Sequence, residues 1–221
     1  DIAVKSMQLN DTGMRLDVTT PKGEATICAN VIGQFNAYNL IAVLATLLAS
    51  DIALVDAVKA ISTIKPVAGR MQKCGGGNQP LIVVDYAHTP DALEQVLKSL
   101  SEQLAPNSQL ICVFGCGGDR DKGKRPLMGK VSSSLASRVI VTSDNPRGES
   151  AKSIIQAVMA GADQRMESIE NRADAIKQAI KTAKKGDVVL IAGKGHEDYQ
   201  EIAGVKYPFS DMQVAQETLR E

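Results

Sequence analysis

From residue 81 onward, short apolar runs alternate with helix-forming stretches, and this alternation limits the possible folds more than any other feature of the chain. Strands are expected at residues 81–85, 110–114, 138–142, 166–169 and 187–192, and helices at 90–104, 125–136, 151–160 and 172–184. A hairpin near 199–207 and a helix from Asp211 follow. Regular alternation of this kind is typical of a parallel sheet with helices on both faces. The sequence therefore predicts an α/β fold with a mostly parallel sheet.

The first part of the chain has a different pattern. Short β-rich pieces in residues 1–35, with turn residues at Asn10–Asp11 and at 21–23, predict a small antiparallel meander. One helix is expected to end near Ala49, and its apolar run from residue 39 favours a buried helix; a second helix is expected at 54–61. Proline and glycine break the helical pattern at residues 65–70, where we place a domain boundary.

Composition excludes several classes of protein. The chain has 221 residues, 44% of them hydrophobic, which is enough for one large or two modest domains with a core. A net charge of zero and few aromatic residues argue against nucleic acid as the main partner. No apolar run approaches the ~20 residues that span a bilayer.

The start of the chain and its cysteines favour a cytoplasmic protein. The chain opens DIAVK, without a methionine, a basic n-region or an apolar h-region, so we expect no signal peptide and the interior of a longer protein. Its four cysteines form no CxxC pair. Reduced, mostly structural thiols are the favoured interpretation over metal or disulfide roles.

Polar clusters follow the expected strands at 81–85, 110–114, 138–142 and 187–192. Their loops read DYAHTP, GCGGDRDKGKRP, SDNPRGE and GKGHE, and both histidines of the chain, His88 and His196, occur in them. The carboxyl ends of parallel strands collect ligands, because they meet at one edge of the sheet. Four such loops therefore favour a single site.

The SDNPRGE loop at residues 143–149 is the most informative of the four. It places an acid, an amide, a guanidinium and a second acid around a rigid proline, directly after a buried strand. The planar guanidinium of Arg147 is suited to holding a carboxylate through two parallel hydrogen bonds. The loop is thus expected to hold a small zwitterionic ligand, with a solvated turn as the alternative.

The other loops contribute further charges. Arg120 can offer a fork to a carboxylate or phosphate, and Glu197 can offer a carboxylate to an ammonium group. We interpret Asp121, Lys122 and Lys124 as an exposed charged turn; His196 is either catalytic or structural. The sequence contains neither GxGxxG nor GxxxxGK[ST], so hydride chemistry and a triphosphate cradle are not expected.

Together with GQFNAYN at 33–39 and GRM at 69–71, these loops closely resemble the Mur ligases, the ATP-dependent amino-acid ligases of peptidoglycan precursor synthesis. The resemblance runs along essentially the whole chain. It implies that residues 1–67 are the C-terminal part of a central ATP-binding domain and 68–221 a C-terminal, Rossmann-like domain that brings the amino acid. The family's P-loop, magnesium-binding residues and modified lysine are expected upstream of Asp1, so the chain is expected to be inactive alone.

The resemblance also implies roles for individual residues. Asn36 and Asn39 match positions near the adenine, Arg70 an arginine that reaches ATP, and Asp85 an acid near the ribose; His88 lies in the same nucleotide-facing motif. Within the family the resemblance is to members that add meso-diaminopimelate. Their amino-acid-binding set corresponds to Arg120, Asp144, Asn145, Pro146, Arg147, Gly193 and Glu197.

By resemblance, the expected activity is addition of meso-diaminopimelate to a UDP-N-acetylmuramoyl dipeptide through an acyl phosphate, with ATP and Mg²⁺ as cofactors. Arg147 is the specificity clue, because relatives that add lysine lack this arginine. We expect a monomer that binds neither nucleic acid nor membrane, with residues 65–70 as a hinge. The alternatives are a lysine-adding relative and a non-catalytic amino-acid- or nucleotide-binding module.

Overall fold

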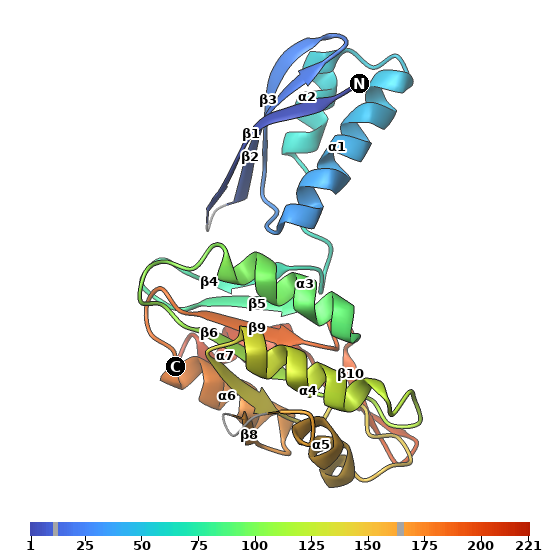
Figure 1. The fold of residues 1–221 in the computed structure, drawn as a ribbon, viewed down its shortest axis with the longest axis vertical. Coiled ribbons are helices and arrows are strands. Elements are labelled where there is room, and N and C mark those ends of the chain that lie inside the picture. The colour runs from blue at the N-terminus through green and yellow to red at the C-terminus, as the bar shows by residue number, and fades with distance from the viewer. Residues whose placement is uncertain (11–12, 163–165) are drawn as a thin grey trace. The chain divides into compact units, whose positions relative to one another are not determined.

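The computed structural model describes residues 1–10, 13–162 and 166–221 (Figure 1). The chain divides into two compact units, Asp1–Val67 and Ala68–Glu221. Asp11, and with it the turn expected at Asn10–Asp11, lies outside the described residues.

Unit 1 is a three-stranded antiparallel sheet with two helices. Its strands are β1 (Ala3–Asn10), β2 (Gly13–Thr20) and β3 (Gly23–Ala29), in the order β1-β2-β3. The helices are α1 (Gln34–Ala49) and α2 (Leu54–Ser62). The antiparallel meander predicted from the sequence is confirmed, with the second turn at residues 21–22.

The prediction that residues 39–49 lie in a buried helix is wrong for unit 1 taken by itself. Only one face of α1 is buried, through Ala37, Leu40 and Leu44 at helical spacing. The other face exposes Tyr38 and Val43, at 72% and 39% of their surface. The run of apolar residues was therefore a poor guide to burial, because it does not distinguish the two faces.

Unit 2 contains a six-stranded sheet in the order β4-β5-β9-β6-β7-β8. The strands are β4 (Gln72–Gly75), β5 (Leu81–Asp85), β6 (Leu110–Phe114), β7 (Arg138–Val141), β8 (Met166–Ser168) and β9 (Val188–Ala192). All neighbours pair in parallel except β4, which runs antiparallel to β5. The predicted α/β fold is confirmed; β4 was not predicted, because its sequence QKCG has no strand pattern.

Helices cover both faces of this sheet (Figure 1). One layer holds α3 (Pro90–Ser101), α4 (Lys124–Leu135) and α5 (Ala151–Met159); the other holds α6 (Arg172–Thr182) and α7 (Asp211–Thr218). Alternate strand residues such as Ile82, Val113 and Ile191 pack on α6 and α7. Strands β6 and β9 are buried at every residue, as expected for a parallel sheet covered on both faces.

The register of the sheet brings four strand ends to one level. Ala192 at the end of β9 lies opposite Asp85 of β5 and Phe114 of β6, and Phe114 lies opposite Val141 of β7. The loops that follow these strands therefore share one edge, as the sequence predicted. After β9 the chain forms a separate hairpin, β10 (Tyr199–Ile202) and β11 (Val205–Pro208). In the described part of the chain, no helix is long and apolar enough to cross a membrane.

A completely buried ion pair fixes the backbone at this edge of the sheet. The Arg172 guanidinium donates through Nε and Nη2 to both carboxylate oxygens of Asp211, at 2.7 and 2.8 Å. Its Nη2 also donates to the carbonyl of Ala192, at 3.0 Å, and Nη1 to that of Ser143, at 3.4 Å. One side chain at the start of α6 thus ties the ends of β7 and β9 to α7.

Replacing Asp211 by asparagine should destabilise unit 2 by about 3–5 kcal/mol, because it removes the counter-charge that is hydrogen-bonded to the buried Arg172. Urea unfolding followed by tyrosine fluorescence measures this, since Tyr86, Tyr199 and Tyr207 lie in unit 2. The matched control is Glu94→Gln, which breaks the exposed pair with Lys98 and should cost under about 1 kcal/mol. Equal losses in the two variants would contradict the structural role of the buried pair.

Candidate functional site

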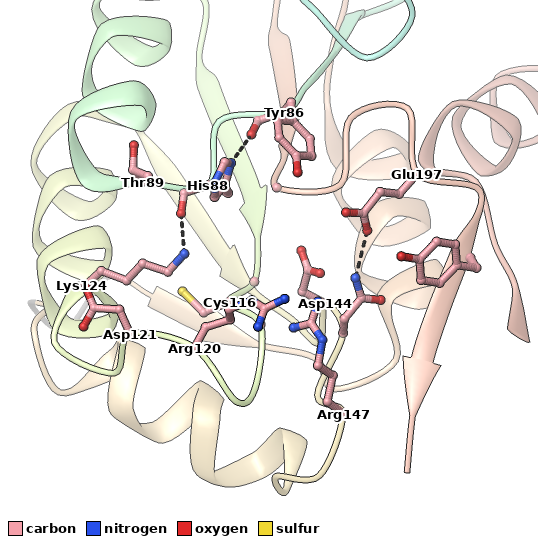
Figure 2. A pocket seen from close by; sticks show the side chains of 15 residues that line it. Tyr86, His88, Thr89, Cys116, Arg120, Asp121, Lys124, Asp144, Arg147 and Glu197 are labelled. Atoms are coloured by element: carbon pink, nitrogen blue, oxygen red, sulfur yellow. Dashed lines mark hydrogen bonds between the residues drawn. The ribbon is translucent and has the colours of Figure 1, made fainter. Parts of the chain in front are cut away.

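The four loops at the sheet edge enclose a cavity of about 480 Å³ (Figure 2). The loops after β5, β6, β7 and β9 all contribute to its lining, as does Tyr199 of β10. The predicted residues among the lining are His88, Arg120, Asp144, Asn145, Arg147, Gly193 and Glu197. Pro146 is buried in the same loop but lines a neighbouring cavity of about 680 Å³ instead. The structure therefore gathers most of the predicted amino-acid-binding set around one space.

A buried lysine contacts Asp144, Asn145 and Glu197, the three residues that we call the floor of the cavity. Lys194 has no exposed side-chain surface, and its Nζ donates to Asn145 Oδ1 at 3.0 Å and to Glu197 Oε2 at 3.1 Å. The same Nζ lies 3.9 Å from the carboxylate of Asp144. Asn145 in turn donates to Glu197 Oε2 at 2.8 Å. Sequence reasoning assigned no role to Lys194, although the GKGHE loop placed it between two predicted residues.

The pKa values of the Asp144 and Glu197 carboxyl groups are shifted in opposite directions. Burial raises the pKa of Asp144, against the opposing charges of Arg172 and Lys194. Burial also acts to raise the pKa of Glu197, but hydrogen bonds from Asn145 and Lys194 outweigh it and leave that pKa below its ordinary value. Glu197 is therefore an ionised acceptor, and its second oxygen can accept from a ligand's ammonium group.

Gly193 places the backbone against one of these carboxylates. Its φ is +113°, in a region that favours glycine, and a Cβ there would stand 2.7 Å from Asp144 Oδ2. A side chain at this position would displace the carboxylate, so the glycine shapes the floor.

Two guanidinium groups supply positive charge on another side of the cavity. In Figure 2, Arg120 and Arg147 point toward its middle, near Asp144. Arg147 is half-buried and donates through Nη1 to the carbonyl of Gly118, at 2.9 Å, whereas Arg120 is exposed. The cavity thus carries carboxylates and guanidinium groups within reach of one small ligand.

The residues interpreted as an exposed charged turn are partly built into the site. Lys124 is half-buried at the start of α4, lines the cavity and donates through Nζ to the carbonyl of His88, at 2.7 Å. Asp121 is exposed but also lines the cavity. The turn interpretation is therefore wrong for Lys124, because a contact between loops 36 residues apart in sequence decides its role.

The β6 and β7 loops are joined by Glu149, which the sequence did not single out. Its carboxylate accepts from Arg125 at 2.7 and 3.0 Å and from the amide of Asp119 at 2.7 Å. The hydrogen bond from Arg125 is the main cause that lowers the pKa of Glu149 from its ordinary 4.5 to about 2. This link holds the Arg120 and Arg147 loops side by side.

Two of the residues expected to face a nucleotide, Arg70 and His88, lie around the ring of Tyr86, and His88 and Tyr86 also line the cavity. The exposed Arg70 guanidinium lies 4.9 Å from the centre of the Tyr86 ring, which also contacts His88 and His196. His88 is exposed, and its Nδ1 lies 2.9 Å from the carbonyl oxygen of Tyr86. An exposed arginine stacked on an aromatic ring is suited to a phosphate or another anion.

Asp85 has a role that the sequence did not reveal. It is buried, and its two oxygens accept from the amides of Met71 and Ala87, at 2.9 and 2.8 Å. Burial raises its pKa, against these hydrogen bonds and the Arg70 charge. Asp85 thus fixes the backbone on either side of the Arg70–Tyr86 contact. Asn36 and Asn39 lie in unit 1, on the first turns of α1, where Asn39 donates to Asn36.

Comparison with known proteins identifies the architecture built around this site. Residues 69–195, more than half of the chain, match the family described as "Mur ligase, glutamate ligase domain". The chain belongs to the Mur ligase family. The resemblance inferred from the motifs is thereby confirmed, and the family match contains three of the four loops of the cavity and the first residues of the fourth.

Curated relatives carry one name. A protein of Chromobacterium violaceum is 52% identical over 94% of this chain, and one of Pseudomonas aeruginosa is 46% identical over 97%; both are called UDP-N-acetylmuramoyl-L-alanyl-D-glutamate–2,6-diaminopimelate ligase. A solved structure with the same name matches the whole chain at 40% identity and a TM-score of 0.75. This Mur ligase chain covers 42%, 44% and 45% of those three proteins.

More distant solved structures share the fold alone. A UDP-N-acetylmuramate–alanine ligase of Thermotoga maritima matches at 17% identity with a TM-score of 0.69. A folylpolyglutamate synthase of Mycobacterium tuberculosis matches 87% of the chain at 22% identity, also with a TM-score of 0.69.

The described residues offer no metal centre. Among residues 1–10, 13–162 and 166–221, no group of three or more His, Cys, Asp or Glu side chains could hold a metal ion. Cys116 lines the cavity, but burial raises the pKa of its thiol to about 11, so it is protonated at neutral pH.

Glu149→Gln should destabilise the chain at neutral pH, and the difference from wild type should shrink as the solution is acidified. A carboxyl with a lowered folded-state pKa stabilises the fold above its unfolded pKa and loses that contribution as pH falls through the folded value. For Glu149 this window runs from about 4.5 down to about 2. Melting temperatures of both proteins between pH 7 and pH 2.5 measure the gap, with the exposed Glu102→Gln as control; a gap independent of pH would refute the link.

Proposed function

We propose that this chain is the C-terminal part of an ATP-dependent ligase that adds meso-diaminopimelate to UDP-N-acetylmuramoyl-L-alanyl-D-glutamate. The names of the relatives support the proposal, as does the match of the chain to just under half of their length. In this assignment residues 1–67 belong to the central ATP-binding domain and 68–221 form the domain that brings the amino acid.

The observation that carries the proposal is the distribution of charge in the cavity. Asp144 and Glu197 provide acceptors for an ammonium group, while Arg147 and Arg120 provide donors for a carboxylate. An amino acid with a second carboxylate at its far end satisfies both sets. The buried Lys194 offsets part of the negative charge of Asp144 and Glu197. The site therefore suits a zwitterion better than a simple cation.

Discrimination against lysine follows from the same geometry. Meso-diaminopimelate differs from lysine by one carboxylate, and Arg147 is the better-fixed partner for it. A charge-assisted hydrogen bond is worth ~1.5–3 kcal/mol. A polar site that the wrong ligand leaves unpaired can reject that ligand by roughly 10⁴-fold. Lysine in this cavity leaves the guanidinium without its counter-charge.

In the proposed reaction, ATP phosphorylates the side-chain carboxylate of the D-glutamate, the amine of diaminopimelate attacks the acyl phosphate, and phosphate leaves. The contribution of the described residues is to hold the attacking amino acid in one orientation, which is an entropic effect. Arg70 on Tyr86, with His88 beside it, is proposed to meet the nucleotide, as are Asn36 and Asn39.

Other parts of the machinery are assigned to the rest of the protein. Mg²⁺ is proposed to bind mainly residues upstream of this chain, as the resemblance to the Mur ligases implies. Residues 65–70 are the proposed hinge between the two domains. The proposed setting is the cytoplasm, in peptidoglycan precursor synthesis, with its consequences for cell shape and division.

Calorimetric titration of the chain with meso-diaminopimelate and with lysine tests the proposal. The first ligand should bind at least tenfold more tightly, and Arg147→Ala should abolish the difference, because it removes a charge-assisted contact. Arg15→Ala removes an exposed arginine of unit 1 and should leave both affinities unchanged.

Equal affinity for lysine and diaminopimelate in the wild-type chain would contradict the assignment and favour a lysine-adding relative. Binding of neither amino acid would refute the assignment of the cavity. A P-loop encoded upstream of Asp1 supports a ligase over a stand-alone binding module.

A further inference from the structure

The β10–β11 hairpin is hydrogen-bonded to the loop that carries Arg147. The amide of Arg147 donates to the carbonyl of Glu201 at 3.1 Å, and the amide of Ala203 donates back to the carbonyl of Arg147 at 2.8 Å. The amide of Glu201 also donates to the side-chain oxygen of Asn145, at 2.9 Å. One hairpin residue, Glu201, therefore contacts two residues of the proposed amino-acid site, yet it does not line the cavity itself.

These bonds hold Arg147 in a backbone conformation that a non-glycine residue rarely adopts. Its φ is +50°, in the left-handed region, which costs energy for a residue with a Cβ. The pairing with the hairpin compensates that cost and sets the direction in which the side chain leaves the loop. Any residue at position 201 can supply this backbone pairing.

The Glu201 carboxylate adds a contact that depends on its side chain. Its Oε2 lies 3.4 Å from Nε of Arg147, and Nη1 of the same guanidinium donates to the carbonyl of Gly118. Because the guanidinium is planar, the hydrogen bond at Nη1 and the ion pair at Nε together restrict its orientation. Among the described residues, Nη2 makes no hydrogen bond, and Arg147 lines the cavity.

The residue at position 117 also affects the space around this guanidinium. A Cβ at residue 117 would stand 2.8 Å from Nη1 of Arg147, so the glycine leaves room for the arginine in this position. The Arg147 and Glu201 side chains expose 21% and 25% of their surface, so water screens their attraction only in part. A pair of this kind contributes little to folding, and its main effect is on the orientation of the arginine.

We propose that Glu201 is a positioning residue for amino-acid selection: it holds the Arg147 guanidinium so that its free edge meets the distal carboxylate of the ligand. This inference rests on the proposed function. It adds a second residue of the hairpin, after Tyr199 in the lining, to a site built mainly from the four strand-end loops. Without the carboxylate, the guanidinium can rotate, and the ligand must then order it on binding.

The variants Glu201→Ala and Glu201→Gln separate the carboxylate from the backbone pairing, which both retain. Glu201→Ala should weaken meso-diaminopimelate binding about fivefold and leave lysine binding unchanged, because an ion pair of this exposure is worth up to about 1 kcal/mol. Glu201→Gln keeps an acceptor for Nε and should recover part of the loss. The exposed Glu102→Ala removes the same charge elsewhere and should have no effect, and all melting temperatures should stay close to that of the wild type.

The Nε–H signal of Arg147 in ¹⁵N NMR tests the pair without any ligand. It is assigned by its absence in Arg147→Ala, and it should shift and exchange faster in Glu201→Ala. An unchanged signal, an unchanged preference for diaminopimelate, or an equal loss of affinity for both amino acids would overturn the role of Glu201. A wild-type chain without any preference, but with the expected NMR change, would instead refute the proposed function and leave the pair intact.

Discussion

The site depends on the common level at which strands β5, β9, β6 and β7 end. Register alone aligns these ends, but the buried Arg172 guanidinium holds two of them by donating to the carbonyls of Ser143 and Ala192 while it is neutralised by Asp211. A charge buried in this way is costly unless every donor finds an acceptor. Separating the strand ends would therefore expose the Arg172 charge or leave it without acceptors. The loops that follow these strands thus start from fixed positions.

Beyond the strand ends, the polar residues of the cavity hold one another before any ligand binds. Lys194 and Asn145 orient Glu197, Glu149 joins two loops, and Glu201 reaches Arg147 from the hairpin. Groups that are already oriented lose less freedom on binding, which favours affinity and selectivity. In the proposed function, the same arrangement presents the amine of the amino acid to a reaction centre in the rest of the protein.

The sequence predicted the parallel sheet and the four loops because both are local patterns: apolar runs of strand length, each followed by polar residues. It did not predict β4, whose four residues form a strand only by pairing with β5. Lys194, Glu149 and Glu201 were missed for a related reason, since each acts through partners that the fold brings close. Asp85 was assigned by resemblance to a position near the ribose, but its two backbone partners could not be predicted from one sequence.

The most direct test of the account is a crystal structure of the chain soaked with meso-diaminopimelate. We expect one end of the ligand to place its ammonium group on Glu197 and the distal carboxylate to lie on Nη2 of Arg147, with the Glu201 contact retained. A ligand bound in this cavity with the Arg147 guanidinium turned away from it would contradict the account.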